Sequence, residues 1–175
     1  AYPEIVFGQK PGGPSTTAAL PLLVKAVGAA KIDYEVSSTH SGDLNLAFDI
    51  WLTSTANPDT WGVPPITHEI MIWIDRAGMA PGGAWKGTIE INGATYLVYV
   101  GDKWGDGWRY VAFVSKEPQI GAGSIDLAPF LAYMQENKLA TGDEYLASIE
   151  FGNEIASGTG ETVLSRYAVV IEKNP

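Results

Sequence analysis

Two glutamates, Glu69 and Glu154, have the residue type and the surroundings that best suit chemistry. Each lies in a run that predicts a β-strand, and they are so far apart in the sequence that only the fold can bring them together. A facing pair of carboxyl groups is what cleavage of a glycosidic bond requires: one protonates the leaving oxygen, and the other attacks the sugar or activates a water. The alternative for each is a solvated residue on an exposed strand face.

The strand predicted from Thr67 to Ile74 carries the first glutamate. Side chains alternate between the two faces of a strand, so the isoleucines at alternate positions form a core face, while Glu69, Met71 and Trp73 share the other face. A carboxylate, a thioether and an indole in a row suit a cleft that holds a ligand with both polar and flat apolar surfaces. A sugar chain has such surfaces.

A second strand, Leu44 to Thr53, alternates in the same way. Its large apolar residues predict a core face, and Asn45 and Asp49 lie on the opposite face, where a neighbouring strand could place them beside Glu69. A carboxylic acid within hydrogen-bond reach of a nucleophilic carboxylate can orient it and adjust its pKa. We therefore expect a hydrogen bond between Asp49 and Glu69, with a plain surface aspartate as the alternative.

The composition narrows the range of possible functions and partners. The 175 residues suit one domain, residues 1–175, and the net charge of -9 argues against nucleic acid and against anionic membrane surfaces as partners. There are no cysteines, and the apolar stretch from Ala18 to Ala30 is too short and too interrupted to span a membrane, so we expect neither a disulfide scaffold nor a signal peptide. His40 and His68 lack further ligands at metal-binding spacing, so we expect structural histidines, no metal and no cofactor.

Many short runs of β-formers, separated by glycine and proline, predict an all-β fold: a two-layer antiparallel β-sandwich. Asn92-Gly93 predicts a tight hairpin turn. A turn at His40 to Asp43 and a break after Glu154 are expected to divide the long flanking segments into separate strands. Leu146 is expected on the face of Glu150 and Glu154 if no bulge intervenes.

A single helix is predicted from Leu127 to Leu139, packed on the outer face of the sandwich. Asp126 can cap its start, and Gly142 follows its end. The apolar stripe that would pack on the sheet comprises Leu127, Phe130, Leu131 and Met134.

With these residues laid out, the sequence resembles the glycoside hydrolase family 12 endoglucanases, small cellulases with a concanavalin-like β-jelly roll and a concave substrate cleft. Four segments carry the resemblance: Tyr2-Pro3-Glu4-Ile5-Val6-Phe7-Gly8, Asn45-Leu46-Ala47-Phe48-Asp49-Ile50-Trp51, His68-Glu69-Ile70-Met71-Ile72-Trp73 and Phe151-Gly152-Asn153-Glu154. The resemblance implies a secreted, cofactor-free, retaining endo-β-1,4-glucanase that cuts internal bonds of cellulose or related β-glucans.

Matched position by position, the resemblance implies Glu69 as the nucleophile, Glu154 as the acid/base and Asp49 as the residue that orients Glu69. It implies four cleft residues that contact the sugar: Asn45, Met71, Trp73 and Pro81.

Other functions fit the same architecture: a non-catalytic carbohydrate-binding jelly-roll module, a xyloglucan-specific hydrolase or a xylanase. A binding module has no need for two apposed carboxyl groups, which favours the enzyme. The usual N-terminal strands of the family have no counterpart here, so we expect a truncated or divergent short member. It should be a monomer unless another chain supplies those strands.

Overall fold

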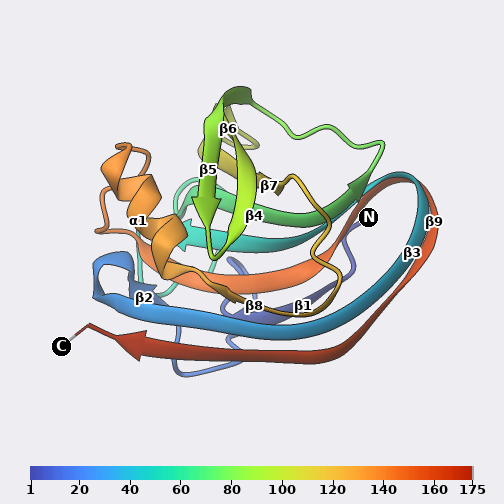
Figure 1. The fold of residues 1–175 in the computed structure, drawn as a ribbon. Coiled ribbons are helices and arrows are strands. Elements are labelled where there is room, and N and C mark those ends of the chain that lie inside the picture. The colour runs from blue at the N-terminus through green and yellow to red at the C-terminus, as the bar shows by residue number, and fades with distance from the viewer. Residues whose placement is uncertain (175) are drawn as a thin grey trace.

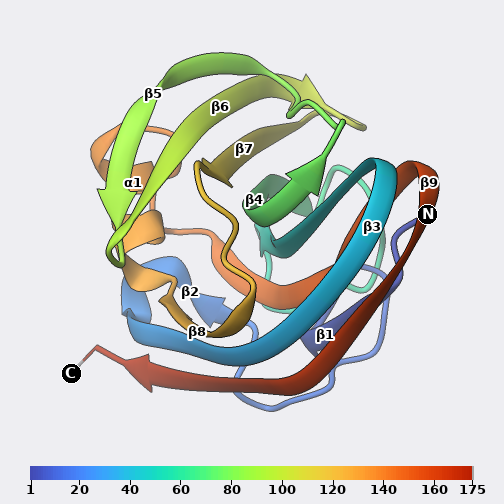
Figure 2. The ribbon, with the colours of Figure 1, turned by 45° about the vertical axis from the view of Figure 1, so that its right-hand side comes forward.

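Two long strands, β3 (Val27–Thr53) and β9 (Tyr145–Lys173), form the frame of the computed structural model, which describes residues 1–174. They pair antiparallel along nearly their whole length, from Val27 opposite Lys173 to Thr53 opposite Tyr145. Both strands bend together at one side of the molecule, so each contributes to two layers (Figure 2). The two layers therefore belong to one continuous hydrogen-bonded sheet.

The bend lies where the sequence predicted a turn and a break, and there the chain does not leave the sheet. Gly42 pairs with Gly158, and both have positive φ, 105° and 109°. A Cβ on Gly158 would overlap the Ser41 carbonyl oxygen, so glycine is needed for this close crossing. The predicted division into four strands is therefore wrong: the glycines bend the two strands without ending them.

The curved layer that carries the candidate site has the strand order β1-β9-β3-β4-β7-β6-β5 (Figure 1). Its shorter strands are β1 (Glu4–Gly8), β4 (Ile66–Ala77), β5 (Ala84–Ile91), β6 (Ala94–Trp104) and β7 (Trp108–Ser115). In the other layer β8 (Gly121–Asp126) pairs with the first half of β3. The short β2 (Leu22–Leu23), followed by a 3-10 turn at Val24–Ala26, pairs with the start of β9 at Tyr145 and Leu146, next to the part of β9 that pairs with β1.

The strand pairing is antiparallel, as predicted, with one exception. The Asn92-Gly93 turn, with positive φ at both residues, joins β5 and β6 as expected. This hairpin lies at the edge of the sheet, and the chain then returns as β7 beside β4 in the same direction, so β4 and β7 are parallel. The sheet is therefore mixed, and the fully antiparallel prediction is corrected at this pair.

The core lies between the layers and contains the apolar faces predicted from the two alternating strands. One large buried cluster contains alternate residues of both strands: Leu46, Phe48, Ile50 and Leu52 of β3, and Ile70, Ile72 and Ile74 of β4. The opposite face of β4 packs into a separate, smaller cluster that includes Met71 and Trp73. Alternation thus separated the core face from the candidate cleft face correctly.

A bulge near the start of β9 changes the face on which Leu146 was expected. Trp51 pairs with Ser148 and Leu52 with Leu146, so the register skips Ala147. Leu146 is consequently turned into the core beside Ile149, not toward Glu150 as the uninterrupted alternation indicated.

The helix α1 (Ala128–Glu136) is shorter at both ends than predicted. The Asp126 carboxylate accepts hydrogen bonds from the backbone N–H groups of Ala128 and Ala30, at 3.0 and 3.1 Å, and so joins the helix start to β3. Phe130 packs edge-on against Phe113 and Tyr96, which belong to the core cluster. The helix therefore packs against the core face of the curved layer, the face opposite to that of Glu69, whereas the sequence placed it on the outer face of the sandwich. Among the residues described, no helix has the length and apolar character to cross a membrane.

Candidate active site

The face of the curved layer that points away from the core forms the floor of the candidate site. A cavity of about 170 Å³ opens there, and both Glu69 of β4 and Glu154 of β9 line it. The other residues that line it are Trp73, Met79, Ala80, Gly82, Trp104 and Tyr110. Larger cavities, of about 460, 480 and 280 Å³, lie elsewhere, and each of these is lined by a single carboxyl group. The fold thus brings together the two glutamates singled out from the sequence.

Glu69 is held by an indole. It lies opposite Trp51 in the β3–β4 ladder, and its Oε2 accepts a 2.7 Å hydrogen bond from Nε1 of Trp108, on the parallel strand β7. Burial raises the pKa of Glu69 to about 7, with a further rise from the negative charge of Glu154, against the lowering effects of the Trp108 hydrogen bond and of Lys10. Glu69 therefore changes ionisation near neutral pH.

Glu154 is held by an amide. The side chain of Asn45, which is fully buried at 0% exposure, donates from Nδ2 to Oε2 of Glu154 at 2.7 Å. The Oδ1 atom of Asn45 accepts from the backbone N–H of Glu154 at 3.2 Å, so the amide is oriented from both ends. Asn45 was predicted as a sugar contact, and the structure places it beneath Glu154, where it fixes the position of that carboxyl group.

Asp49 lies on the cleft face, on the strand next to Glu69, as predicted, but no hydrogen bond joins the two carboxyl groups among the residues that the structure describes. Its direct partner on β4 is Met71, so Glu69 lies on a diagonal. Asp49 is 5% exposed, and its Oδ1 is buried without a hydrogen-bond partner. Burial and the nearby charges of Glu69 and Glu150 hold the pKa of Asp49 well above its usual range. A protonated Asp49 is thus available as a hydrogen-bond donor.

The three predicted cleft residues on or after β4 differ in their access to the cavity. Trp73 lines it, and its Nε1 donates to the sulfur of Met71 at 3.4 Å. Met71 itself is 2% exposed and belongs to the packed layer beneath the floor. Pro81 lies between Ala80 and Gly82, which both line the cavity, although Pro81 does not.

Several cleft aromatics were not singled out as site residues. Trp104 and Tyr110 line the cavity with their rings stacked at 4.9 Å, and Trp108 packs edge-on against Trp51 and Trp61. For Tyr110 and Trp108, the alternation along their strand indicated only that they could lie on the face away from the core. Trp104 is the last residue of β6, and its place depends on the pairing of β6 with β7, which no local pattern encodes.

Two charged residues were also missed, Lys10 and Glu150. Glu150 lies opposite Asp49 on β9, is 0% exposed, and is bound by the ammonium group of Lys10 at 2.9 Å. Its position on the face of Glu154 was readable from the sequence. Its burial was not, because the chain segment that covers it comes from the distant N-terminus.

The prediction of a structural histidine at position 68 is confirmed. His68 is 7% exposed, and its ring nitrogens hydrogen bond with the Thr67 hydroxyl and the Leu139 carbonyl at 2.9 and 2.8 Å. Burial lowers its pKa, so His68 is neutral at neutral pH. His40 pairs with Asp75 at 2.8 Å, away from the cleft carboxyl groups.

The fold and the site together define a β-jelly roll with two carboxyl groups in a cleft lined by aromatic side chains. Residues 11–172 match glycosyl hydrolase family 12, and the chain belongs to this family. Membership fits the pair of carboxyl groups on the cleft floor, because cleavage of a glycosidic bond requires such a pair.

Comparison with known proteins gives relatives of this family. The chain is 28% identical to endoglucanase S of Pectobacterium parmentieri over 179 residues, covering 98% of this chain and 66% of that protein. It is 30% identical to the xyloglucan-specific endo-beta-1,4-glucanase A of Aspergillus niger, covering 77% of this chain but 56% of that protein. The chain thus spans less than two thirds of the length of both curated relatives.

Solved structures agree on the fold. Endoglucanase cel12A from Rhodothermus marinus superimposes with a TM-score of 0.88 at 28% identity, covering 99% of this chain and 75% of that one. A family 12 xyloglucanase from Bacillus licheniformis gives a TM-score of 0.87, also at 28% identity, over 98% of this chain and 75% of that one. These likenesses confirm the predicted jelly-roll sandwich.

Proposed function

We propose that the chain is a retaining endo-β-1,4-glucanase that hydrolyses internal glucosidic bonds of cellulose or related β-glucans. The observation that carries the proposal is the pair of glutamates on one cavity, each with one oxygen bound by a neutral donor, Trp108 or Asn45. Such an arrangement leaves the second oxygen of each carboxyl group for chemistry. The family and the endoglucanases among its relatives support the reaction class.

In the proposed first step, an oxygen of ionised Glu69 attacks the anomeric carbon, and the bond from that carbon to the leaving oxygen breaks. Glu154 gives its proton to the leaving oxygen, so the departing sugar leaves with a neutral hydroxyl. The hydrogen bond from Trp108 is made to the ionised form of Glu69, which favours ionisation against the effect of burial.

In the second step a water replaces the departed sugar. Glu154, now ionised, removes a proton from the water, whose oxygen attacks the anomeric carbon and releases Glu69 as a carboxylate. Two inversions give net retention of the β configuration. Asn45 holds Glu154 in place through both steps, since its amide can donate to either protonation state of the carboxyl oxygen.

Asp49 is proposed as a positioning residue for Glu69, acting from the neighbouring strand as a neutral acid. Trp104, which is 40% exposed, is proposed to form the wall that packs against a sugar face, because flat rings pack against the apolar faces of pyranose units. Trp73 and Tyr110 line the cavity but are each 2% exposed, so they are proposed to close its floor. Met71 acts from beneath by supporting Trp73, and Pro81 by shaping the bend that carries Ala80 and Gly82. A polymeric β-glucan cannot enter a cell, so the proposed place of action is extracellular.

A xyloglucan-specific hydrolase is the second candidate, because several relatives are named xyloglucan-specific endo-beta-1,4-glucanases. The test measures release of reducing ends from carboxymethyl-cellulose, barley glucan and xyloglucan by the chain and by its Glu69→Gln variant. We expect release from at least one glucan and none from the variant, while the variant still binds the glucan. Binding without any release by the unaltered chain would identify a carbohydrate-binding module instead.

A further inference from the structure

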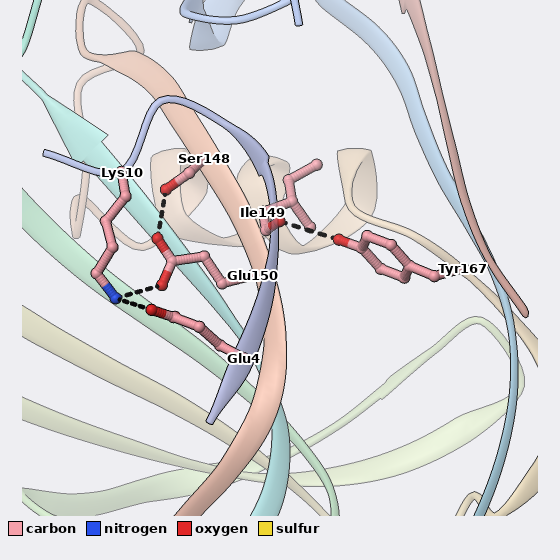
Figure 3. A network of polar contacts seen from close by, with 6 residues as sticks. All are labelled: Glu4, Lys10, Ser148, Ile149, Glu150 and Tyr167. Atoms are coloured by element: carbon pink, nitrogen blue, oxygen red, sulfur yellow. Dashed lines mark hydrogen bonds and ion pairs between the residues drawn. The ribbon is translucent and has the colours of Figure 1, made fainter. Parts of the chain in front are cut away.

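Glu150, on β9, is a further carboxyl group beneath the cleft, and it has no part in the double displacement. Its side chain is fully buried, at 0% exposure, and it lies directly opposite Asp49 in the β3–β9 ladder. Oε1 accepts a 2.9 Å hydrogen bond from the hydroxyl of Ser148, and Oε2 accepts one of the same length from Nζ of Lys10 (Figure 3). Burial of an acidic group without a partner is costly, so the contact with Lys10 stabilises Glu150 in this position.

Lys10 reaches this position from the loop that follows β1. Its ammonium group binds Oε1 of Glu4 at 2.6 Å as well as Glu150 (Figure 3). It also lies 5.6 and 5.8 Å from the ring centres of Tyr2 and Trp61. Its side chain is 30% exposed, whereas that of Glu150 is completely covered. The ion pair therefore joins the N-terminal segment to the floor of the cleft.

The charge around this ammonium group is strongly one-sided. The titratable groups around the floor interact with one another and include Tyr2, Glu4, Asp49, Glu69, Tyr110, Glu150 and Glu154. Among the residues that the structure describes, Lys10 is the one cation in this group. Its positive charge lowers the pKa values of Asp49, Glu69 and Glu150, each of which burial raises.

We propose that Lys10 is a positioning residue for the hydrolysis proposed above: it holds Glu150 against Asp49 and supplies the positive charge that lets Glu69 ionise in its buried position. The path runs across adjacent strands, from Glu150 on β9 through Asp49 on β3 to Glu69 on β4. Lys10 makes no hydrogen bond to Glu69, so it acts through Glu150 and through its charge. The inference rests on the proposed function only for its effect on catalysis.

The test compares the pH dependence of kcat/KM on a soluble glucan for four variants. Lys10→Met removes the charge at similar length, and we expect the acidic limb of the profile to move to higher pH by about half a unit to one unit. Burial raises the pKa of Glu150 to about 8, so Glu150→Gln replaces a largely protonated acid and should leave the acidic limb nearly unchanged. The double variant should show the same upward move as Lys10→Met, and Lys10→Arg should keep the unaltered profile.

The matched control is Lys25→Met, which removes a lysine paired at 2.7 Å with Asp143 on the exposed surface. It should leave the profile unchanged. Because Lys10→Met leaves the buried carboxyl group of Glu150 without its partner, that variant alone could fail by unfolding. The double variant removes both partners together, and its profile compared with that of Glu150→Gln then reports the effect of Lys10.

A second readout does not need catalysis: a carbon-13 NMR titration of labelled glutamate carboxyl groups in the same proteins. An upward shift of the Glu69 titration in Lys10→Met supports the inference even if no glucan is cleaved, in which case the proposed function alone fails. Normal hydrolysis with the same titration and the same acidic limb in Lys10→Met as in the unaltered chain would overturn the inference.

Discussion

Glu69 should destabilise the folded protein at neutral and alkaline pH, so its replacement by Gln should stabilise the chain there. The pKa of this group rises on folding from its ordinary value of 4.5 to about 7. Each unit of pKa difference corresponds to about 1.36 kcal/mol, so ionised Glu69 lowers the free energy of unfolding by about 3 kcal/mol. For a chain of this size, that is a change in Tm of roughly 6 to 12 °C.

The stability difference between Glu69→Gln and the parent depends on pH because folding raises the pKa of Glu69. Below about pH 4.5 the carboxyl group is protonated in both the folded and the unfolded states, and Glu69→Gln should have little effect on Tm. As pH rises through about 7 the folded form must ionise Glu69 in a buried position, and the advantage of the variant should reach its full size. The amide oxygen of Gln can still accept the hydrogen bond from Trp108, so packing is preserved.

Calorimetric melts of the chain and of Glu69→Gln at pH 4 and pH 8 would measure this difference. Glu90→Gln is the matched control, since Glu90 is an exposed residue of β5, and it should shift Tm by less than about 1 °C at either pH. A variant that is no more stable than the parent at pH 8, or equally stabilised at both pH values, would refute the claim that Glu69 is buried with a raised pKa.

Three further substitutions test the contacts around the pair. Trp108→Phe removes the 2.7 Å hydrogen bond to Glu69, so the acidic limb of the kcat/KM profile should move to higher pH by about one to two units, with little loss of kcat/KM at pH 9. An unmoved limb would contradict the role of Trp108 in favouring the ionised form of Glu69. Asn45→Ala removes the hydrogen bond that holds Glu154. In steady-state assays, kcat should fall about 10- to 100-fold on glucans but much less on aryl glycosides with good leaving groups. Equal losses on both substrates would count against Glu154 as an acid held by Asn45. Trp104→Ala removes a cavity wall that stacks on Tyr110, so KM should rise about 3- to 10-fold with kcat nearly unchanged, and an unchanged KM would place Trp104 outside the sugar-binding surface.

The two faces of β3 and β4 could be predicted from the sequence because both strands lie in a sheet with one apolar and one polar face. Strict alternation then assigns Phe48 and Ile72 to the core and Asp49 and Glu69 to the cleft. The Asn92-Gly93 turn was predictable for a similarly local reason, since few residues other than Asn and Gly adopt its positive φ values.

The remaining features depend on partners distant in sequence. Gly42 was read as part of a turn because glycine commonly ends a strand, whereas its pairing with Gly158 lets two strands bend together. The predicted hydrogen bond from Asp49 to Glu69 failed for a related reason: register places Asp49 opposite Met71, which no pattern within one strand can reveal. The burial of Glu150 likewise depends on Lys10, which is 140 positions away.

The central claim is that Glu69 attacks the sugar and Glu154 protonates the leaving group, and proton NMR of the first-formed product tests it most directly. Double displacement on this pair predicts that the β-anomer appears first and then mutarotates to the equilibrium mixture. An α-anomer appearing first would show that a water attacks directly in a single inversion, and would contradict the roles assigned to both glutamates.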